Sequence, residues 1–204
     1  MKLYGSLTSP YVRKVRMVLM EKNLSCEMLV EGPADAAGNV VRLNPLRAIP
    51  VLERDDGEVF FDSTMICEYI DSLNDMPRLY PSSGEARWQA LRWHALGQGM
   101  MEATVARFVE LRKPTEKQDA ANAAKHEARI AAVLAFAAAR VPSGGFISGN
   151  TIGIADITLA AALGYIDLRY AHDWRGQHPK LASWFAAISQ RPSFVETLAP
   201  ELKK

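Results

Sequence analysis

A serine and a proline at the start of the first predicted helix constrain this chain more than any other feature. Ser9-Pro10 follows the short apolar stretch at residues 3–7 and precedes a helical run at residues 12–22. Serine is a favoured N-cap residue, and proline suits the first helical position because the N–H it lacks would have no partner there. We therefore predict a strand followed at once by a helix whose N-terminus carries a hydroxyl. A simple helix cap is the alternative interpretation of Ser9.

The first 80 residues mix short strands with helices. Apolar runs with strand character occupy residues 2–5, 26–30, 51–53 and 59–61, and Asp55-Asp56-Gly57 predicts a hairpin between the last two. Residues 63–73 carry apolar side chains at helical spacing. The resulting order, close to β-α-β-α-β-β-α, predicts a mixed sheet with helices packed on its faces.

The second half is predicted to be helical. Residues 79–84 are polar and contain proline and glycine, so they are the best linker candidate, and long helical patterns follow at residues 85–113 and 115–140. A further helix is expected from Gly153 to about Tyr170, with the Asp156 carboxylate reaching back to the cap amide and Ile152 and Ile157 forming a hydrophobic staple. That assignment gives Asp156 a structural role and not a catalytic one.

Composition excludes several classes of function. A net charge of +1 over 204 residues offers no general attraction for nucleic acid, and no apolar run reaches the ~18 residues of a membrane span. We expect a cytoplasmic protein. Cys26 and Cys67 lie outside any metal-ligand or dithiol spacing, and the four histidines are too far apart to form a ligand cluster, so no metal site is expected.

Four motifs together resemble the cytosolic glutathione S-transferase family, in particular its bacterial members with serine at the active position. These motifs are Ser9-Pro10-Tyr11-Val12-Arg13-Lys14-Val15-Arg16, Asn44-Pro45-Leu46-Arg47-Ala48-Ile49-Pro50-Val51-Leu52, Asp62-Ser63 and Gly153-Ile154-Ala155-Asp156. The resemblance implies an α/β thioredoxin-like domain over residues 1–80 that binds glutathione as co-substrate. It also implies an all-α helical-bundle domain over residues 85–204 that forms the electrophile pocket, and a homodimer.

The resemblance implies a thiolate-stabilising role for Ser9. Redox relatives of the same fold carry cysteines where this chain has Ser9 and Val12, so the chain has no sulfur of its own for disulfide exchange at these positions. The helix start would instead hold the glutathione sulfur as a thiolate, with the Ser9 hydroxyl as donor and Arg13 and Arg16 adding a more distant positive field. Ser6 and Thr8 are the alternative hydroxyls.

The other glutathione contacts are also implied by the resemblance. The Ile49-Pro50 bond is expected to be cis, which turns the Val51 backbone toward the cysteinyl part of glutathione. Asp62 and Ser63 open a helix suited to the γ-glutamyl group, with a plain helix cap as the alternative. Relatives often carry lysine or glutamine at the position of Ala48, so Arg47 either replaces that contact or is a solvated loop charge.

The electrophile pocket is the least defined part of the prediction. Its candidate lining residues, for which a place in the core is the alternative, are Tyr11, Met100, Met101, Thr104 and Phe108. The function predicted is glutathione transfer to small hydrophobic electrophiles. The alternatives are a binding or regulatory protein of the same fold with little turnover, and a glutathione-dependent peroxidase or isomerase.

Overall fold

The computed structural model describes residues 1–203 and divides into two compact units. The first unit contains Met1–Tyr80 together with the C-terminal segment that starts at Pro192, and the second is Pro81–Arg191. The division after Tyr80 lies within the stretch 79–84 that the sequence suggested as a linker. Residues 192–203, which the sequence analysis placed in the helical domain, instead pack with the first unit.

The first unit is built on a four-stranded mixed sheet. Its strands are β1 (Lys2–Gly5), β2 (Glu27–Val30), β3 (Val51–Glu53) and β4 (Val59–Phe60), in the order β2-β1-β3-β4. β1 runs parallel to β2, whereas β3 is antiparallel to both β1 and β4. All four strands predicted from the sequence are present, with ends that differ by at most one residue.

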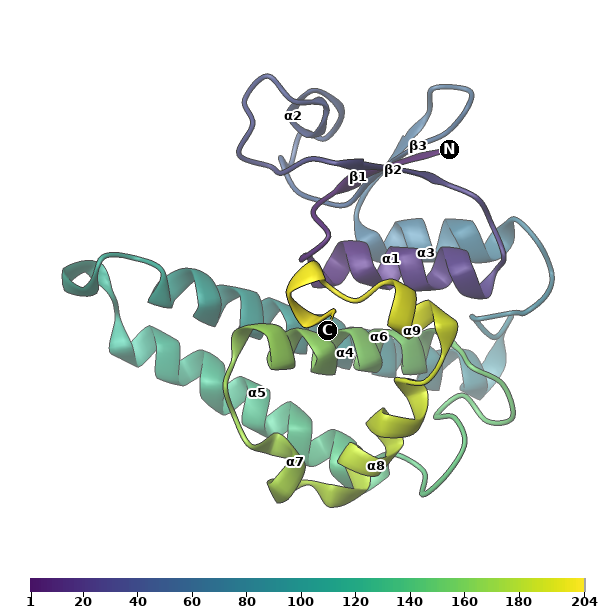
Figure 1. Cartoon of the computed structure of the whole chain (residues 1–204). Helices are drawn as coiled ribbons and strands as arrows, with labels where there is room; N and C mark the ends of the chain where they lie inside the picture. Colours follow the sequence, from purple (N-terminus) through teal and green to yellow (C-terminus); the bar gives the residue numbers. More distant parts are fainter. Residues whose placement is uncertain (204) are drawn as a thin grey trace. The chain divides into compact units, whose positions relative to one another are not determined.

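Helices cover both faces of this sheet. Figure 1 shows α1 (Pro10–Glu21) and α3 (Ser63–Ser72) on one face and the short α2 (Asn39–Leu43) on the other. Because successive strand residues point to opposite faces, Tyr4 and Val51 pack with Val40 of α2 in one cluster. Leu3 and Leu52, each next to one of these residues, are equally buried. The expected thioredoxin-like α/β domain is confirmed.

The C-terminal segment of the first unit is held by two arginines of α1. An Arg13 nitrogen donates to the carbonyl oxygen of Phe194 at 3.1 Å, and the Arg13 guanidinium lies 4.0 Å from the centre of the Phe194 ring. Arg16 donates to the carbonyl oxygens of Glu196 and Thr197 at 3.4 Å each. These contacts are at the end of α9 (Pro192–Glu196), where cations are favourable. The sequence analysis expected these two arginines to add positive charge near the glutathione sulfur. In the structure they also hold the C-terminal segment against α1.

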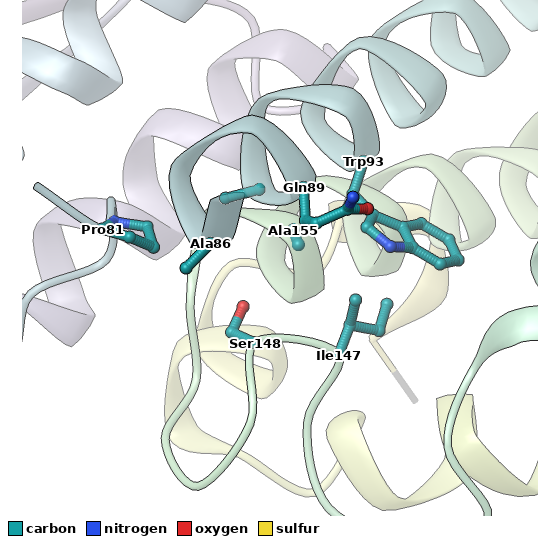
Figure 2. A pocket seen from close by; sticks show the side chains of 8 residues that line it. Pro81, Ala86, Gln89, Trp93, Ile147, Ser148 and Ala155 are labelled. Carbon is teal, nitrogen blue, oxygen red and sulfur yellow. The ribbon is translucent and has the colours of Figure 1, made fainter. Parts of the chain in front are cut away.

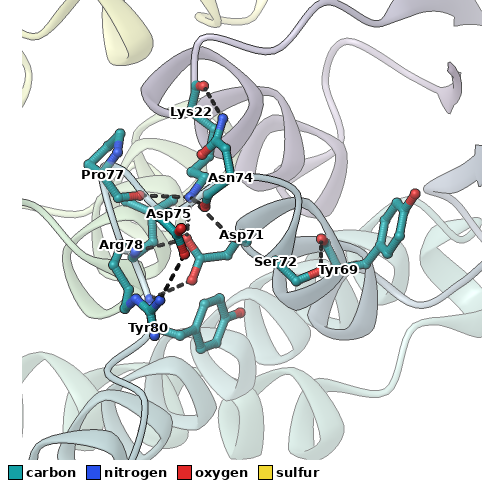
Figure 3. A network of polar contacts seen from close by, with 10 residues as sticks. Lys22, Tyr69, Asp71, Ser72, Asn74, Asp75, Pro77, Arg78 and Tyr80 are labelled. Carbon is teal, nitrogen blue, oxygen red and sulfur yellow. Dashed lines mark hydrogen bonds and ion pairs between the residues drawn. The ribbon is translucent and has the colours of Figure 1, made fainter.

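A buried ion pair joins the ends of α1 and α3. Lys22 Nζ lies 3.0 Å from Asp71 Oδ1, with side-chain exposures of 0% and 8% (Figure 3). The Asp71 carboxylate also accepts hydrogen bonds from the amides of Leu79 and Tyr80, at 2.9 and 3.0 Å. Lys22 Nζ donates in addition to the backbone carbonyl oxygens of Asp71, Asn74 and Pro77. Both charges are therefore surrounded by hydrogen-bond partners.

The second unit is all-helical, as expected. It contains α4 (Gly84–Leu111), the 3₁₀ turn η1 (Thr115–Lys117), α5 (Ala120–Arg140), α6 (Ile154–Arg169), α7 (Trp174–Gln177) and α8 (Pro179–Ile188). α6 is buried continuously from Ile154 to Ile166. α4 approaches it closely at Gly97, where a Cβ would lie only 3.0 Å from the backbone of Thr158.

The connection between α4 and α5 differs from the single helix predicted over residues 115–140. Asp119 Oδ1 accepts hydrogen bonds from the amides of Ala121 and Asn122, at 2.9 and 3.1 Å, so α5 begins after Asp119. The Glu110 carboxylate accepts from Lys113 Nζ, the Asp119 amide and Asn122 Nδ2, at 2.7–2.8 Å. These hydrogen bonds lower the pKa of Glu110 to about 2.

The predicted capping role of Asp156 is confirmed. Its carboxylate accepts hydrogen bonds from the amides of Gly153, Ile147 and Ser148, at 3.0, 2.7 and 3.3 Å. Burial raises the pKa of Asp156, and the hydrogen bonds oppose that rise. The two residues of the predicted staple, Ile152 and Ile157, are both buried. Asp156 thus ties the loop before α6 to the first turn of that helix.

Candidate functional site

The sheet topology brings three predicted site segments to one end of the sheet. Tyr4 of β1 pairs with Val51 of β3, and Leu52 pairs with Phe60 of β4, both in antiparallel register. The carboxyl ends of β1 and β4 therefore lie beside the amino end of β3. The N-termini of α1 and α3 follow those carboxyl ends, so Ser9, Pro50 and Asp62 all belong to this edge of the first unit.

Ser9 is the N-cap of α1 and is partly exposed. Its Oγ accepts a hydrogen bond from the Val12 amide at 3.4 Å. The rival hydroxyls of Ser6 and Thr8 lie 2.9 Å apart and bond to each other. Within residues 1–203, no acceptor is found for the Ser9 hydroxyl proton, so this hydroxyl can donate to a ligand while it caps the helix.

Gly5 makes the close approach between β1, α1 and the Pro50 loop possible. A Cβ at Gly5 would collide with the Val12 side chain and would lie 3.5 Å from the Cβ of Ile49. The first turn of α1 and the residue before Pro50 therefore both pack directly against the end of β1. Sequence reasoning missed Gly5, although a glycine at the end of a strand is a known signal of close backbone approach.

Asn44 organises the loop that leads to Pro50. Its side chain is buried, its Nδ2 donates to the carbonyl oxygen of Ala48 at 2.8 Å, and its Oδ1 accepts from the Leu46 amide at 2.9 Å. Arg47 is exposed in this loop with a φ of 51°. Sequence reasoning noted Asn44 only as part of a motif. Its position before a proline, where asparagine commonly bonds the backbone two residues on, was the available signal.

The backbone around Val51 agrees with the expected geometry. The Ile49-Pro50 peptide bond is cis, which confirms that prediction. The register with β4 includes Leu52 and Glu53 but not Val51, while Val51 pairs on its other side with Tyr4. The pairing between β3 and β4 therefore ends at Leu52 and does not reach Val51. The role of Val51 in glutathione binding remains a prediction.

Asp62 serves as the N-cap of α3. Its Oδ1 accepts hydrogen bonds from the amides of Thr64 and Met65, at 2.8 and 3.4 Å, and its Oδ2 has no hydrogen-bond partner among residues 1–203. Ser63 is the first residue of the helix and is buried. A groove of about 650 Å³ extends from Asp62 along α3, past Met65 and Tyr69. The cap and a ligand contact are compatible because they use different oxygens.

The predicted electrophile residues lie in different environments. Tyr11 is half-buried in the first turn of α1. On α4, Met100, Met101 and Thr104 are buried, and the Thr104 hydroxyl donates to the carbonyl oxygen of Met100 at 2.8 Å. Phe108 is partly exposed, with the Arg169 guanidinium 4.4 Å from its ring centre.

A separate cavity of about 250 Å³ lies between α4 and the loop before α6. Figure 2 shows Gln89 and Trp93 of α4 facing Ile147 and Ser148 of that loop. The remaining lining residues are Pro81, Ala86, Ala90 and Ala155. The predicted electrophile residues do not line this cavity.

Neither cysteine thiol of the chain is easily ionised. Burial raises the pKa of Cys67 to about 12 and that of Cys26 to about 11, so neither thiol ionises readily. Within residues 1–203, no group of three or more histidine, cysteine, aspartate and glutamate side chains is arranged to hold a metal ion. The helices in this range also lack the length and apolar character needed to cross a membrane.

Comparisons with known proteins agree with this architecture. Residues 3–78 match the family model for the glutathione S-transferase N-terminal domain, and residues 103–187 match that for the C-terminal domain. The GST-like protein YibF of Escherichia coli K12 is 32% identical over 202 residues, covering 98% of this chain and 100% of its own length.

Two solved structures are also similar. A glutathione S-transferase from Methylobacillus flagellatus, with glutathione bound, has a TM-score of 0.92 and 38% identity, covering 96% of this chain and 98% of its own. A glutathione transferase family member from Pseudomonas fluorescens, with S-(propanoic acid)-glutathione bound, has a TM-score of 0.87 and 35% identity over 98% and 99%. With both domain models matched in order and relatives similar over nearly the whole length, this chain belongs to the glutathione S-transferase family of enzymes.

Proposed function

We propose that this enzyme conjugates glutathione to small hydrophobic electrophiles, and that Ser9 stabilises the glutathione thiolate. The observation that carries the proposal is the Ser9 hydroxyl at the N-cap of α1, on the sheet edge that also holds Pro50 and Asp62. The Methylobacillus flagellatus relative supports the choice of ligand, because its structure contains glutathione.

The chemistry follows from the helix N-terminus. A free thiol has a pKa near ~8.5, and a helix N-terminus with a hydrogen-bond donor lowers it, each unit corresponding to ~1.4 kcal/mol in favour of the anion. The thiolate then forms a carbon–sulfur bond with the electrophile, whose leaving group departs or whose double bond takes up a proton. The conjugate bound by the Pseudomonas fluorescens relative, S-(propanoic acid)-glutathione, supports sulfur alkylation as the outcome.

For the rest of glutathione we propose contacts along the same edge. The free side of the Val51 backbone pairs with the cysteinyl part, and Pro50 and Ile49 shape that surface. Asp62 meets the γ-glutamyl ammonium through its Oδ2, while the start of α3 at Ser63 faces the γ-glutamyl carboxylate. Arg47, exposed beside Ala48, binds the glycyl carboxylate. We propose that the electrophile contacts the residues predicted from the sequence, which are Tyr11, Met100, Met101, Thr104 and Phe108.

We also propose a cytoplasmic homodimer with a role in detoxification. Exposed apolar side chains support the dimer, because Met65 and Leu73 on or next to α3 are each 41% exposed and Trp88 on α4 is 65% exposed. Sedimentation tests whether the protein is a homodimer. A monomer at micromolar concentration would contradict it.

The role of Ser9 is tested by the thiolate absorbance of bound glutathione as a function of pH. In Ser9→Ala we expect the pKa of the bound thiol to rise by about one unit and kcat/KM to fall about tenfold or more, because one charge-assisted hydrogen bond is lost. Thr8→Val is the matched control, since it removes a neighbouring hydroxyl and should leave the thiol pKa in place. An unchanged pKa in Ser9→Ala, with glutathione still bound, would remove Ser9 from the mechanism.

A further inference from the structure

The loop between α2 and β3 exposes its middle residues and buries the residue that starts it. Residues 45–48 are exposed, whereas Asn44 before them and Pro50 after them are buried. Asn44 directly follows α2, and its amide donates to the carbonyl oxygen of Val40 at 2.9 Å. The whole loop belongs to the first unit and leads into the cis bond at Pro50. It therefore lies on the same unit as Ser9 and Asp62.

The Asn44 residue fixes the conformation of these exposed neighbours. Its Nδ2 donates to the carbonyl oxygen of Ala48 at 2.8 Å, and its Oδ1 accepts from the Leu46 amide at 2.9 Å. Its backbone carbonyl oxygen accepts from the Arg47 amide, also at 2.9 Å. A buried side-chain amide is costly to leave without partners, and Asn44 is only 1% exposed. The loop is thus bonded to Asn44 at each of the residues 46 to 48.

Arg47 has a strained backbone within this loop. Its φ of 51° is in the left-handed region. Within residues 1–203 the other non-glycine residue with a positive φ is Asn23, and asparagine adopts this region more easily than arginine does. Such strain persists where surrounding contacts enforce it, and it is frequent at ligand-binding segments. The hydrogen bonds of Asn44 supply that enforcement.

The guanidinium of Arg47 is free to meet a ligand. Its side chain is exposed and makes no hydrogen bond or ion pair within residues 1–203. Other arginines of the first unit are engaged, since Arg42 donates to Asn39 Oδ1 at 3.0 Å and Arg54 pairs with Asp56. A guanidinium group suits a carboxylate because it can donate two parallel hydrogen bonds to it.

We propose that Asn44 is a positioning residue for glutathione and acts through Arg47. Its hydrogen bonds hold the loop in the conformation in which the Arg47 guanidinium meets the glycyl carboxylate, so that less ordering is needed when glutathione binds. This inference rests on the proposed function, because it explains how the proposed contact of Arg47 is prepared. Asn44 itself does not touch the ligand, and the thiol pKa is set separately at the N-terminus of α1.

The test uses calorimetry with glutathione and with its glycyl ethyl ester, in which the glycyl carboxylate carries no charge. We expect the wild-type enzyme to bind glutathione about tenfold more tightly than the ester, because the ester loses charge-assisted hydrogen bonds. In Asn44→Ala this preference should fall to within about twofold. The pKa of the bound thiol, measured by thiolate absorbance at saturating glutathione, should stay the same. A purely structural defect would weaken the binding of both ligands equally and leave the preference intact.

Two variants of the loop region serve as control and as second measurement. Asn39→Ala is the matched control, because Asn39 is an exposed asparagine of α2 whose Nδ2 donates to Glu31 Oε2 at 3.2 Å. It should retain the preference. Asn44→Asp keeps an acceptor for the Leu46 amide and removes the donor to Ala48, so it should reduce the preference even if Asn44→Ala fails to fold.

Arg47→Gly tests whether Asn44 acts through Arg47. Glycine adopts a positive φ without strain, so this variant should fold as well as the wild type while it loses the preference for glutathione over the ester. Adding Asn44→Ala to Arg47→Gly should change the preference no further, because residues that act as one unit are not additive. A further loss in the double variant would show that Asn44 acts by another route.

The outcomes separate this inference from the proposed function. A preference that survives in Asn44→Ala and Asn44→Asp would overturn this inference alone. Equal binding of glutathione and the ester by the wild-type enzyme would overturn it together with the Arg47 contact, and would leave the role of Ser9 untouched. A wild-type enzyme that does not bind glutathione would overturn the proposed function as a whole.

Discussion

Lys22 Nζ and Asp71 Oδ1 lie 3.0 Å apart and form a buried ion pair between the end of α1 and the end of α3. The same carboxylate holds the amides of Leu79 and Tyr80, so the pair also fixes the last residues before Pro81. The two helices that start at the candidate glutathione site are therefore tied together at their far ends.

Removal of one charge from this pair should be strongly destabilising. In Lys22→Met, Asp71 keeps its two amide donors but loses its counter-charge, and we expect the free energy of unfolding to fall by about 3 kcal/mol. Urea denaturation measures this change. Arg78→Met is the control, because Arg78 and Asp75 form an exposed pair at 3.2 Å and its loss should cost less than about 0.5 kcal/mol. Equal effects of the two substitutions would contradict the structural role of Lys22.

Two glycines of α4 should respond in opposite ways to alanine. At Gly97 the added Cβ would lie 3.0 Å from the Thr158 backbone, which cannot move without shifting α6, so Gly97→Ala should destabilise by about 1–3 kcal/mol. At Gly99 the nearest atom is the end of the flexible Arg129 side chain, and Gly99→Ala should stabilise by up to about 1 kcal/mol through helix propensity. Thermal unfolding of both variants checks the prediction, and a stabilised Gly97→Ala would show that the helices are less tightly packed.

The Glu110 carboxylate should make the free energy of unfolding depend on pH in the acidic range. Its pKa is about 2 in the folded protein, against an ordinary value of 4.5, because Lys113, Asp119 and Asn122 donate to the carboxylate. A lowered folded-state pKa stabilises the protein above pH 4.5, and this contribution is lost as the pH falls from 4.5 toward 2. The stability difference between wild type and Glu110→Gln should therefore shrink over that range.

Urea denaturation at a series of pH values measures this difference, which isolates Glu110 from other groups that titrate in both proteins. Glu116→Gln, an exposed position in η1, is the control and should show little difference from wild type at any pH. If the gap between wild type and Glu110→Gln stayed constant down to pH 2, the hydrogen bonds of Glu110 would not favour its charged form.

Asp62→Asn separates helix capping from ligand binding. Asparagine caps a helix about as well as aspartate, so the free energy of unfolding should change by less than about 1 kcal/mol. If Asp62 meets the γ-glutamyl ammonium, the affinity for glutathione should fall about tenfold. Asp119→Asn, the same change at the equivalent cap of α5, should leave that affinity intact. Calorimetry measures the affinity of both variants for glutathione. Equal affinities in Asp62→Asn and Asp119→Asn would rule out a contact between Asp62 and the γ-glutamyl ammonium.

Features set by local sequence were predictable. Ser9-Pro10 marked the start of α1, Asp156 with its two isoleucines marked the start of α6, and the short apolar runs marked the four strands. In each case the signal and the structure it forms lie within a few residues. The prediction of one helix over residues 115–140 was wrong at its start, where η1 precedes α5. The alanine-rich sequence has high helix propensity, but Asp119 caps α5 and so starts a new helix there.

The sequence by itself determined the family, the order of elements and the residues that begin each helix, because caps, prolines and apolar spacing act over one or two turns. Only the tertiary structure revealed the partners of Lys22 and the packing of Arg13 and Arg16 on the C-terminal segment. Those contacts join residues from 49 to 184 positions apart. Since such distances in sequence carry no periodic signal, packing and burial alone decided which charges found partners.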